Sequence, residues 1–336
     1  MGGRPPSPRV VAATVGRLDA STAWRRFEVD EPGEGWVRLA DRLGDAGGLD
    51  AWYRTELAAT ARGHADLAGA LIVYRLAGAL AELVAGPLLD QRRCLELAPA
   101  AISLRFGDAA RLDARSVSAP VAAVLAGDPD AGSPGSRVVA APADLPAVAV
   151  DGLMAVFGPL AHAVRARAPF GLRGMWGTLA DHLAEVAVRR AREQGRDVEA
   201  AWSAVSALIA DLAAREPLLR ARPRRQAVRW PGGTDLLVAK GTCCLIYKAA
   251  AGPGPGVPAD GAGRGPGVPA DGATGGSRAA AGRHAPAGSP GGALGTVALR
   301  RAIDEAACTS CPLRPEDDRA TRYAAYLAQL RGAQRE

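Results

Sequence analysis

Four of the five cysteines stand in two close pairs toward the C-terminal end of the chain. Cys243 and Cys244 are adjacent in the stretch GTCCLIYK, and Cys308 and Cys311 frame the stretch CTSC. Thiolates are soft ligands that select zinc, copper(I) or iron–sulfur clusters. A chain of 336 residues can bury a sizeable core without disulfide staples. We therefore expect these four residues to form a metal centre.

The spacing of the two pairs differs. Structural zinc sites normally take cysteines separated by a few residues on both sides, which Cys308 and Cys311 satisfy and the adjacent Cys243 and Cys244 do not. A [2Fe–2S] cluster is a longer object with two irons, each of which needs two thiolates. How the adjacent cysteines would divide between the two irons does not follow from the sequence.

The residues around the cysteines resemble a known family. A basic residue before Cys-Cys-Leu-x-Tyr, followed by Cys-x-x-Cys with an apolar tail, is similar to the C-terminal signature of the ferric-siderophore reductase (FhuF-like) family. The matching positions are Lys240, Cys243, Cys244, Leu245, Tyr247, Cys308, Cys311 and Leu313. Trp176-Gly177 also resembles the opening of a helix in that family. The strong match covers the last third of the chain.

The resemblance implies a [2Fe–2S] cluster held by all four cysteines. In that family the cluster passes one electron to ferric iron in a hydroxamate-type siderophore and releases Fe(II) in the cytoplasm. We therefore expect a cytoplasmic ferric-siderophore reductase, with no catalytic residue beyond the cluster. Its partners would be a ferric siderophore and an external donor such as a ferredoxin, because the sequence has no dinucleotide fingerprint and no phosphate-binding loop.

One feature departs from the family pattern, in which the two cysteine pairs lie much closer together. Here 63 residues separate Cys244 from Cys308. Closing the longer flexible loop costs roughly 1.6 kcal/mol more, whereas structural metal–thiolate sites contribute about 10 kcal/mol or more. We expect the insertion to slow or weaken assembly without preventing it. A decayed or mispredicted gene product is the alternative explanation.

A second function stays open on the sequence alone. The four thiolates could hold structural zinc in a non-enzymatic protein whose helical part binds a siderophore or another partner. Siderophore synthetases have a region similar to the helical part, but no nucleotide-binding motif supports a ligase. A zinc protein is colourless and a [2Fe–2S] protein is red-brown, so visible absorption separates the two.

Basic residues before the first cysteine pair are candidates for contact with the substrate or the donor. Nearby positive charge favours a reduced cluster and could steer an anionic siderophore or an acidic ferredoxin, although a solvated charged strand is the alternative. The candidate contact residues are Lys240, Arg224, Arg225, Arg229 and Trp176. Cys94 stands in an apolar context and is expected to be a buried small hydrophobe.

The composition and charge limit the classes of partner that we expect the chain to bind. The net charge of +6 and the pI of about 9.4 would permit nucleic-acid binding, but no zinc-finger spacing or aromatic-rich RNA-binding signature supports it. The N-terminus has no apolar core of signal-peptide length. Arg75 and Glu82 interrupt the most apolar stretch, Leu67–Leu89, so we expect a buried amphipathic helix and no membrane span.

The overall pattern predicts an α+β protein that is mainly helical. A helical N-terminal region with a few short strands precedes a β-hairpin, which leads into a small C-terminal iron–sulfur segment. The expected divisions are 1–34, loosely structured; 35–214, mainly helical and siderophore-interacting; 215–248, a basic hairpin with the first cysteine pair; 249–295, a disordered Gly/Pro/Ala-rich insertion; and 296–336, the second pair and a C-terminal helix.

Apolar periodicity places the elements within these divisions. Helices are expected over 35–43, 49–61, 67–89, 145–166, 171–194, 198–214 and 315–331, and strands over 94–97 and 101–106. The insertion contains GPGVPADGA twice, at 254–262 and 265–273, and too few large apolar residues to offset the entropy of ordering. His284 lies inside it and is not expected to bind a metal.

Overall fold

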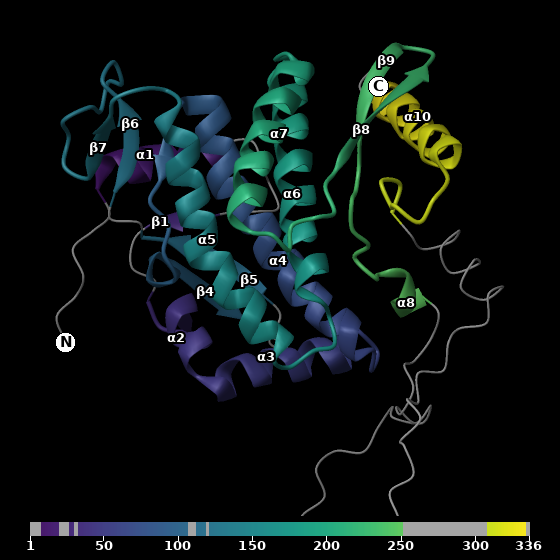
Figure 1. The fold of residues 1–336 in the computed structure, drawn as a ribbon, viewed down its shortest axis with the longest axis horizontal. Coiled ribbons are helices and arrows are strands. Elements are labelled where there is room, and N and C mark those ends of the chain that lie inside the picture. Colours follow the sequence, from purple (N-terminus) through teal and green to yellow (C-terminus); the bar gives the residue numbers. More distant parts are fainter. Residues whose placement is uncertain are drawn as a thin grey trace, which may run out of the picture.

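The computed structural model describes residues 8–19, 27–29, 33–106, 112–118, 121–250 and 308–333. Helices predominate in this part and the strands are short, which confirms the predicted α+β, mainly helical fold. Long helices form the centre of the molecule. The strands β6 and β7 lie at one side of this bundle, and the β8–β9 hairpin with the C-terminal helix α10 lies at the other (Figure 1).

Four long helices build the centre: α4 (Ala65–Gly86), α5 (Asp144–Arg165), α6 (Leu172–Glu193) and α7 (Val198–Arg215). All four were predicted from apolar spacing. The predicted amphipathic character of α4 is wrong, because side chains on nearly all its faces are buried. A short π-helix, η1 (Pro87–Gln91), continues the chain from α4.

Two described helices are long and apolar enough to cross a membrane, namely Ala65–Gln91 and Asp144–Arg165. The most apolar window of the first is 89% buried inside the fold, and that of the second is 50% buried. Core helices commonly pass the same test of length and composition. The burial of α4 therefore favours a place in the core over a membrane span.

The N-terminal part is more ordered than predicted. Residues 1–34 were expected to be loosely structured, but Arg9–Asp19 forms α1 and Phe27–Val29 forms β1, so the prediction is wrong for these stretches. Helix α1 buries apolar side chains at helical spacing, which ordered packing requires. These side chains are Val10, Val11, Val15 and Leu18.

Two small sheets flank the helices. The first has the order β1-β5-β4-β2, and the second has the order β3-β6-β7. The bounds are β2 Trp36–Arg38, β3 Cys94–Leu95, β4 Ile102–Phe106, β5 Leu112–Val117, β6 Ala122–Leu125 and β7 Ser136–Val139. Strands β3 and β4 were predicted. The helix predicted over 35–43 is wrong for Trp36–Arg38, and α2 (Leu39–Gly44) begins after it, followed by α3 (Ala46–Ala59).

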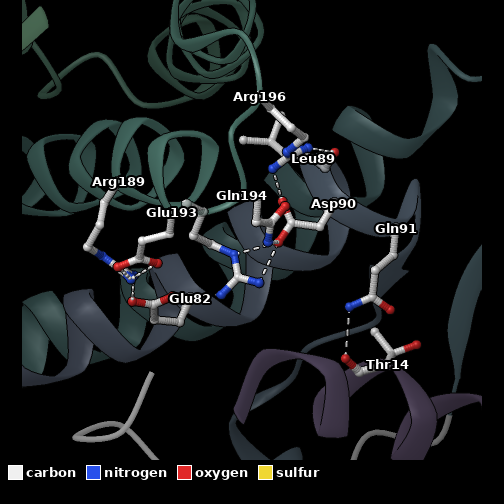
Figure 2. Close-up of polar contacts among 10 residues, drawn as sticks. Thr14, Glu82, Leu89, Asp90, Gln91, Arg189, Glu193, Gln194 and Arg196 are labelled. Atoms are coloured by element: carbon white, nitrogen blue, oxygen red, sulfur yellow. Dashed lines mark hydrogen bonds and ion pairs between the residues drawn. The ribbon is translucent and has the colours of Figure 1, made fainter. Parts of the chain in front are cut away.

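A network of charged side chains fixes α6 against α4 and η1 (Figure 2). The buried Glu82 accepts a hydrogen bond from Arg189, and Asp90 accepts bonds from Arg190 Nε at 2.6 Å and Gln194 Nε2 at 2.9 Å. Buried charges are tolerated when they are paired in this way. The network thus holds α6 in place against α4 and η1.

The predicted hairpin is present as β8 (Arg224–Trp230) and β9 (Gly233–Ala239), paired antiparallel. Helix α10 (Glu316–Ala333) packs on it through a small apolar cluster that includes Val228 and Tyr323. Strand β9 ends before the first cysteine pair, which lies in the loop ahead of the short α8 (Tyr247–Ala250). Ala249 and Ala250, which were expected to belong to the disordered insertion, end α8, so the prediction is wrong for these two residues. The rest of the predicted insertion, with its repeat and His284, lies outside the described residues.

Candidate metal centre

The fold brings the four paired cysteines together, although 63 residues separate Cys244 from Cys308. Their thiols hydrogen-bond in the order Cys243, Cys311, Cys308, Cys244. All four are free of disulfides. Two hairpin-like loops, one after β9 and one before α10, therefore place four soft ligands at one site.

Each of the four sulfurs faces a hydrogen-bond donor two residues further along the chain. The N–H of Leu245 donates to Cys243 Sγ at 3.4 Å, and the N–H groups of Ile246 and Leu313 donate to Cys244 and Cys311. The hydroxyl of Ser310 lies 3.8 Å from Cys308 Sγ. Such donors stabilise thiolate charge and tune metal–thiolate centres.

Backbone geometry lets the adjacent cysteines serve one site. Leu245 has φ +60°, in the left-handed region, so the chain bends directly after the two cysteines. The second pair forms a turn in which Cys311 N–H donates to Cys308 O at 3.0 Å. Lys240 N–H donates to Ser310 O at 2.9 Å and so joins the two loops.

One face of α6 supports the first loop through residues spaced four apart. Asp181 Oδ1 accepts from Gly241 N–H at 2.7 Å, and its Oδ2 accepts from the N–H and the hydroxyl of Thr242 at 3.0 and 2.6 Å. Burial raises the pKa of Asp181 to about 7, although the three hydrogen bonds favour the charged form and by themselves would lower it. The carboxyl group thus fixes the backbone immediately before Cys243.

Two glycines allow the close approach of this loop. A Cβ at Gly177, one turn before Asp181 on α6, would lie 2.1 Å from Thr242 Cγ2. A Cβ at Gly241 would lie 2.5 Å from the carbonyl oxygen of Arg222. Larger residues at either position would push the loop away. In the Trp176-Gly177 dipeptide, the glycine therefore has a structural role, because it leaves room for Thr242 against α6.

Lys240 lies buried beside the thiols. Its ammonium is 3.2 Å from Glu185 Oε1 and 5.3 Å from the ring centroid of Tyr74. Burial alone would lower its pKa, but the charge of Glu185, with smaller contributions from Tyr74, Cys308 and Cys244, raises it overall. The side chain therefore stays positively charged next to the sulfurs, whereas its contact with substrate or donor stays a prediction.

Hydrogen bonds among the thiols shift their pKa values in opposite directions. Hydrogen bonds from Cys244 and Cys311 lower the pKa of Cys308 to about 2, and a bond from Cys311 lowers that of Cys243 to about 7. The donors Cys244 and Cys311 have raised pKa values for the same reason, with burial adding to the effect. A bound cation would release the shared protons, because metal ligands are thiolates.

The predicted arginine contacts lie at different distances from the cysteines. Arg224 pairs with Ala239 at the cysteine end of the hairpin and is exposed. Arg225 is exposed and forms an ion pair with Glu199 at 2.6 Å. Arg229 pairs with Thr234 near the turn, roughly 17 Å further along the strand. Arg224 and Arg225 thus lie at the end of the hairpin that leads into the first pair, and Arg229 lies near the opposite end.

Two other predicted roles are resolved by burial. Trp176 is 1% exposed and packs edge-to-face on Phe157 with ring centroids 4.8 Å apart. Its predicted contact with substrate or donor is therefore wrong, because the ring belongs to the core. Cys94 is fully buried in β3 and burial raises its pKa to about 12, which confirms the expected buried hydrophobe.

Sequence reasoning missed Asp181, Glu185 and Ser310. Asp181 and Glu185 follow Gly177 at intervals of four, which places all three on one helix face. That spacing was visible in the sequence, but it does not say which segment the face contacts. Ser310 lies inside the Cys-x-x-Cys motif, where a hydroxyl next to a sulfur could have been anticipated.

Among the described residues, no three His, Cys, Asp or Glu side chains are grouped as a single metal ion would require. No protein-family model matches the chain, and no curated protein matches it either. The resemblance to ferric-siderophore reductases stays a prediction.

Proposed function

We propose that the four paired cysteines hold a [2Fe–2S] cluster and that the chain reduces ferric siderophores by one electron. The observation that carries the proposal is the meeting of four free thiols from two distant loops, each facing a donor two residues further on. The resemblance of the cysteine motif to the reductase family supports the same function.

The donor set fits the proposed group. Four soft thiolates are the usual ligands of such a cluster, and the residues that would hold it are Cys243, Cys244, Cys308 and Cys311. Bound there, the cluster would supply one-electron chemistry. The described residues supply the remaining requirements, namely hydrogen bonds to the sulfurs and a buried cation.

Buried positive charge counters the negative charge that four thiolates bring together. Lys240 contributes its ammonium group, and the buried Arg314 donates to Cys308 O through Nε at 3.2 Å. These cations stabilise the thiolates and favour the more negative, reduced state of the site. Asp181 and Gly177 act differently, by fixing where the first loop lies against α6.

The proposed reaction needs an electron from outside the chain. A one-electron carrier protein of the ferredoxin class loses one electron, and Fe(III) in a siderophore gains it and becomes Fe(II). Hard hydroxamate oxygens hold Fe(II) much less tightly than Fe(III), so the metal is released. No side-chain nucleophile is required. We place this reaction in the cytoplasm, where both partners would be found.

The test is an anaerobic single-turnover assay. Purified protein is reduced, freed of excess reductant and mixed with ferric hydroxamate siderophores in the presence of a coloured Fe(II) chelator. We expect one Fe(II) per reduced cluster from the wild type and from Cys94→Ser, and none from Cys308→Ser. A colourless protein that contains zinc, or a red-brown protein that produces no Fe(II), would contradict the proposal; the zinc result would support the non-enzymatic alternative.

A further inference from the structure

A cavity of about 420 Å³ opens beside the second cysteine pair. Parts of α4, α6, β9, α10 and the loop before α10 form its walls. Its lining residues include Tyr74, Glu185, Arg192, Ser310, Tyr323 and Tyr326. The hydroxyl of Ser310 is 3.8 Å from Cys308 Sγ and 3.3 Å from Glu185 Oε1. A molecule in the cavity can therefore contact a side chain that itself contacts the thiols.

The walls of this cavity are largely apolar and aromatic. Leu236, Leu237 and Val238 of β9 form one wall. Tyr323 and Tyr326 stack with ring centroids 6.2 Å apart, and Tyr326 is 51% exposed. Small-molecule sites commonly have volumes of about 300–1,000 Å³ and are lined in this way. An exposed aromatic ring at the opening can pack against a ligand without a change of fold.

The charges around the cavity compensate one another. The ion pairs are Arg192 with Asp235, Arg189 with Glu82 and Glu193, and Glu185 with Lys240. Arg190 also lies 3.8 Å from Glu82, so four carboxylates and four cations balance within this set, of which Glu185, Arg189 and Arg192 line the cavity. The adjacent thiolates add further negative charge. A strongly anionic ligand would be repelled here, whereas a neutral or cationic ligand could also use the aromatic faces.

From these observations we propose that the cavity binds the iron(III) chelate, and that it selects chelates without net negative charge. The identity of the ligand rests on the proposed function, whereas the position of the site rests on the cavity itself. The chelate would pack against Tyr326 and the apolar wall of β9, next to Ser310. Its metal would then lie on the same side of the thiols as Ser310.

Gallium(III) chelates test binding without electron transfer, because gallium(III) has nearly the size of iron(III) and is not reduced. Full-length protein purified without oxygen is titrated calorimetrically with the gallium complex of a neutral trihydroxamate. We expect Tyr326→Ala to weaken binding about tenfold, the loss of roughly 1.4 kcal/mol of aromatic contact. Tyr326→Phe should bind within about twofold of the wild type, because the ring remains.

Val138→Ala is the matched control, because Val138 is 48% exposed and lies on β7, across the molecule from the hairpin (Figure 1). It should bind like the wild type. The triply negative gallium tris-catecholate complex should bind at least about tenfold more weakly than the neutral complex. Equal binding of the two complexes, unchanged binding by Tyr326→Ala, or no binding by the wild type would overturn the inference.

The outcomes separate this inference from the proposed function. A protein that reduces ferric siderophores but shows no effect of Tyr326→Ala on gallium chelate binding would overturn the inference alone. A protein that lacks iron but binds the neutral gallium complex through Tyr326 would overturn the proposed function alone.

Discussion

Asp181 and Thr242 form two hydrogen bonds, from the N–H and the hydroxyl of Thr242 to the same carboxylate oxygen, at 3.0 and 2.6 Å. Asp181 lies in the middle of a core helix, and Thr242 directly precedes the first cysteine pair. This link, which Asp181 extends to Gly241 N–H, connects the rigid centre of the molecule with the loop that carries the thiols.

We expect Asp181→Ala to loosen the cysteine loop. The variant removes three hydrogen bonds to a buried carboxylate, a loss on the order of 3 kcal/mol. Amide hydrogen exchange at Gly241 and Thr242 should become at least tenfold faster, while exchange in α5 is unchanged. Wild-type exchange rates at these two amides in the variant would contradict the role assigned to Asp181.

The same residue predicts a pH dependence of stability. Burial raises the folded-state pKa of Asp181 from 3.8 to about 7, so between these values the folded chain binds a proton that the unfolded chain does not. The free energy of unfolding should therefore fall as the pH rises through this window. Denaturant unfolding at a series of pH values measures this free energy for the wild type and for Asp181→Asn. The same dependence on pH in both proteins would contradict the prediction.

Gly177→Ala should displace the loop by steric overlap with Thr242 Cγ2, which an alanine Cβ would meet at 2.1 Å. Thr242→Ser removes that methyl group and keeps the hydroxyl that donates to Asp181. We expect Gly177→Ala to lower the iron content of protein purified without oxygen, and Gly177→Ala/Thr242→Ser to restore most of it. If the double variant is as deficient as the single one, the contact is not the cause.

Ser310→Ala should lower the midpoint potential of the centre by about 40 mV, which corresponds to roughly 1 kcal/mol for one hydrogen bond to a sulfur. The loss of a donor disfavours the more negative, reduced state. Ser310→Thr keeps the hydroxyl and serves as the control. Redox titration followed by electron paramagnetic resonance measures both, and equal potentials for Ser310→Ala and the wild type would argue against a bond to Cys308.

Lys240 and Glu185 should shift the potential in opposite directions. Lys240→Met removes a buried cation beside the thiols and should lower the potential, on the order of 50 mV, whereas Glu185→Gln removes the opposing charge and should raise it. Lys240→Arg keeps the charge and is the control. Shifts of the same sign in the Met and Gln variants would show that packing, and not charge, sets the potential.

The sequence was sufficient to predict the long helices, the hairpin and the candidate ligands, because apolar periodicity and cysteine spacing are local signals. It was not sufficient for the support of the site. Asp181 and Thr242 are 61 positions apart, and the spacing of Gly177, Asp181 and Glu185 marks a helix face without naming its partner. The burial of Trp176 likewise depends on tertiary packing with Phe157.

The short strands were missed for a related reason. Strand β1 has three residues and β7 has four, too few for alternation to stand out. Helix α1 carried a readable pattern of buried apolar residues, but the Gly- and Pro-rich residues before it obscured the start of the helix.

The central claim is tested most directly by measuring iron, acid-labile sulfide and zinc in protein purified without oxygen, for the wild type, Cys94→Ser and the four single serine variants of the paired cysteines. We predict two irons and two sulfides per chain in the wild type and in Cys94→Ser, and substantial loss in each of the other four. Stoichiometric zinc, or iron that persists when any one of the four paired cysteines is replaced, would contradict the account.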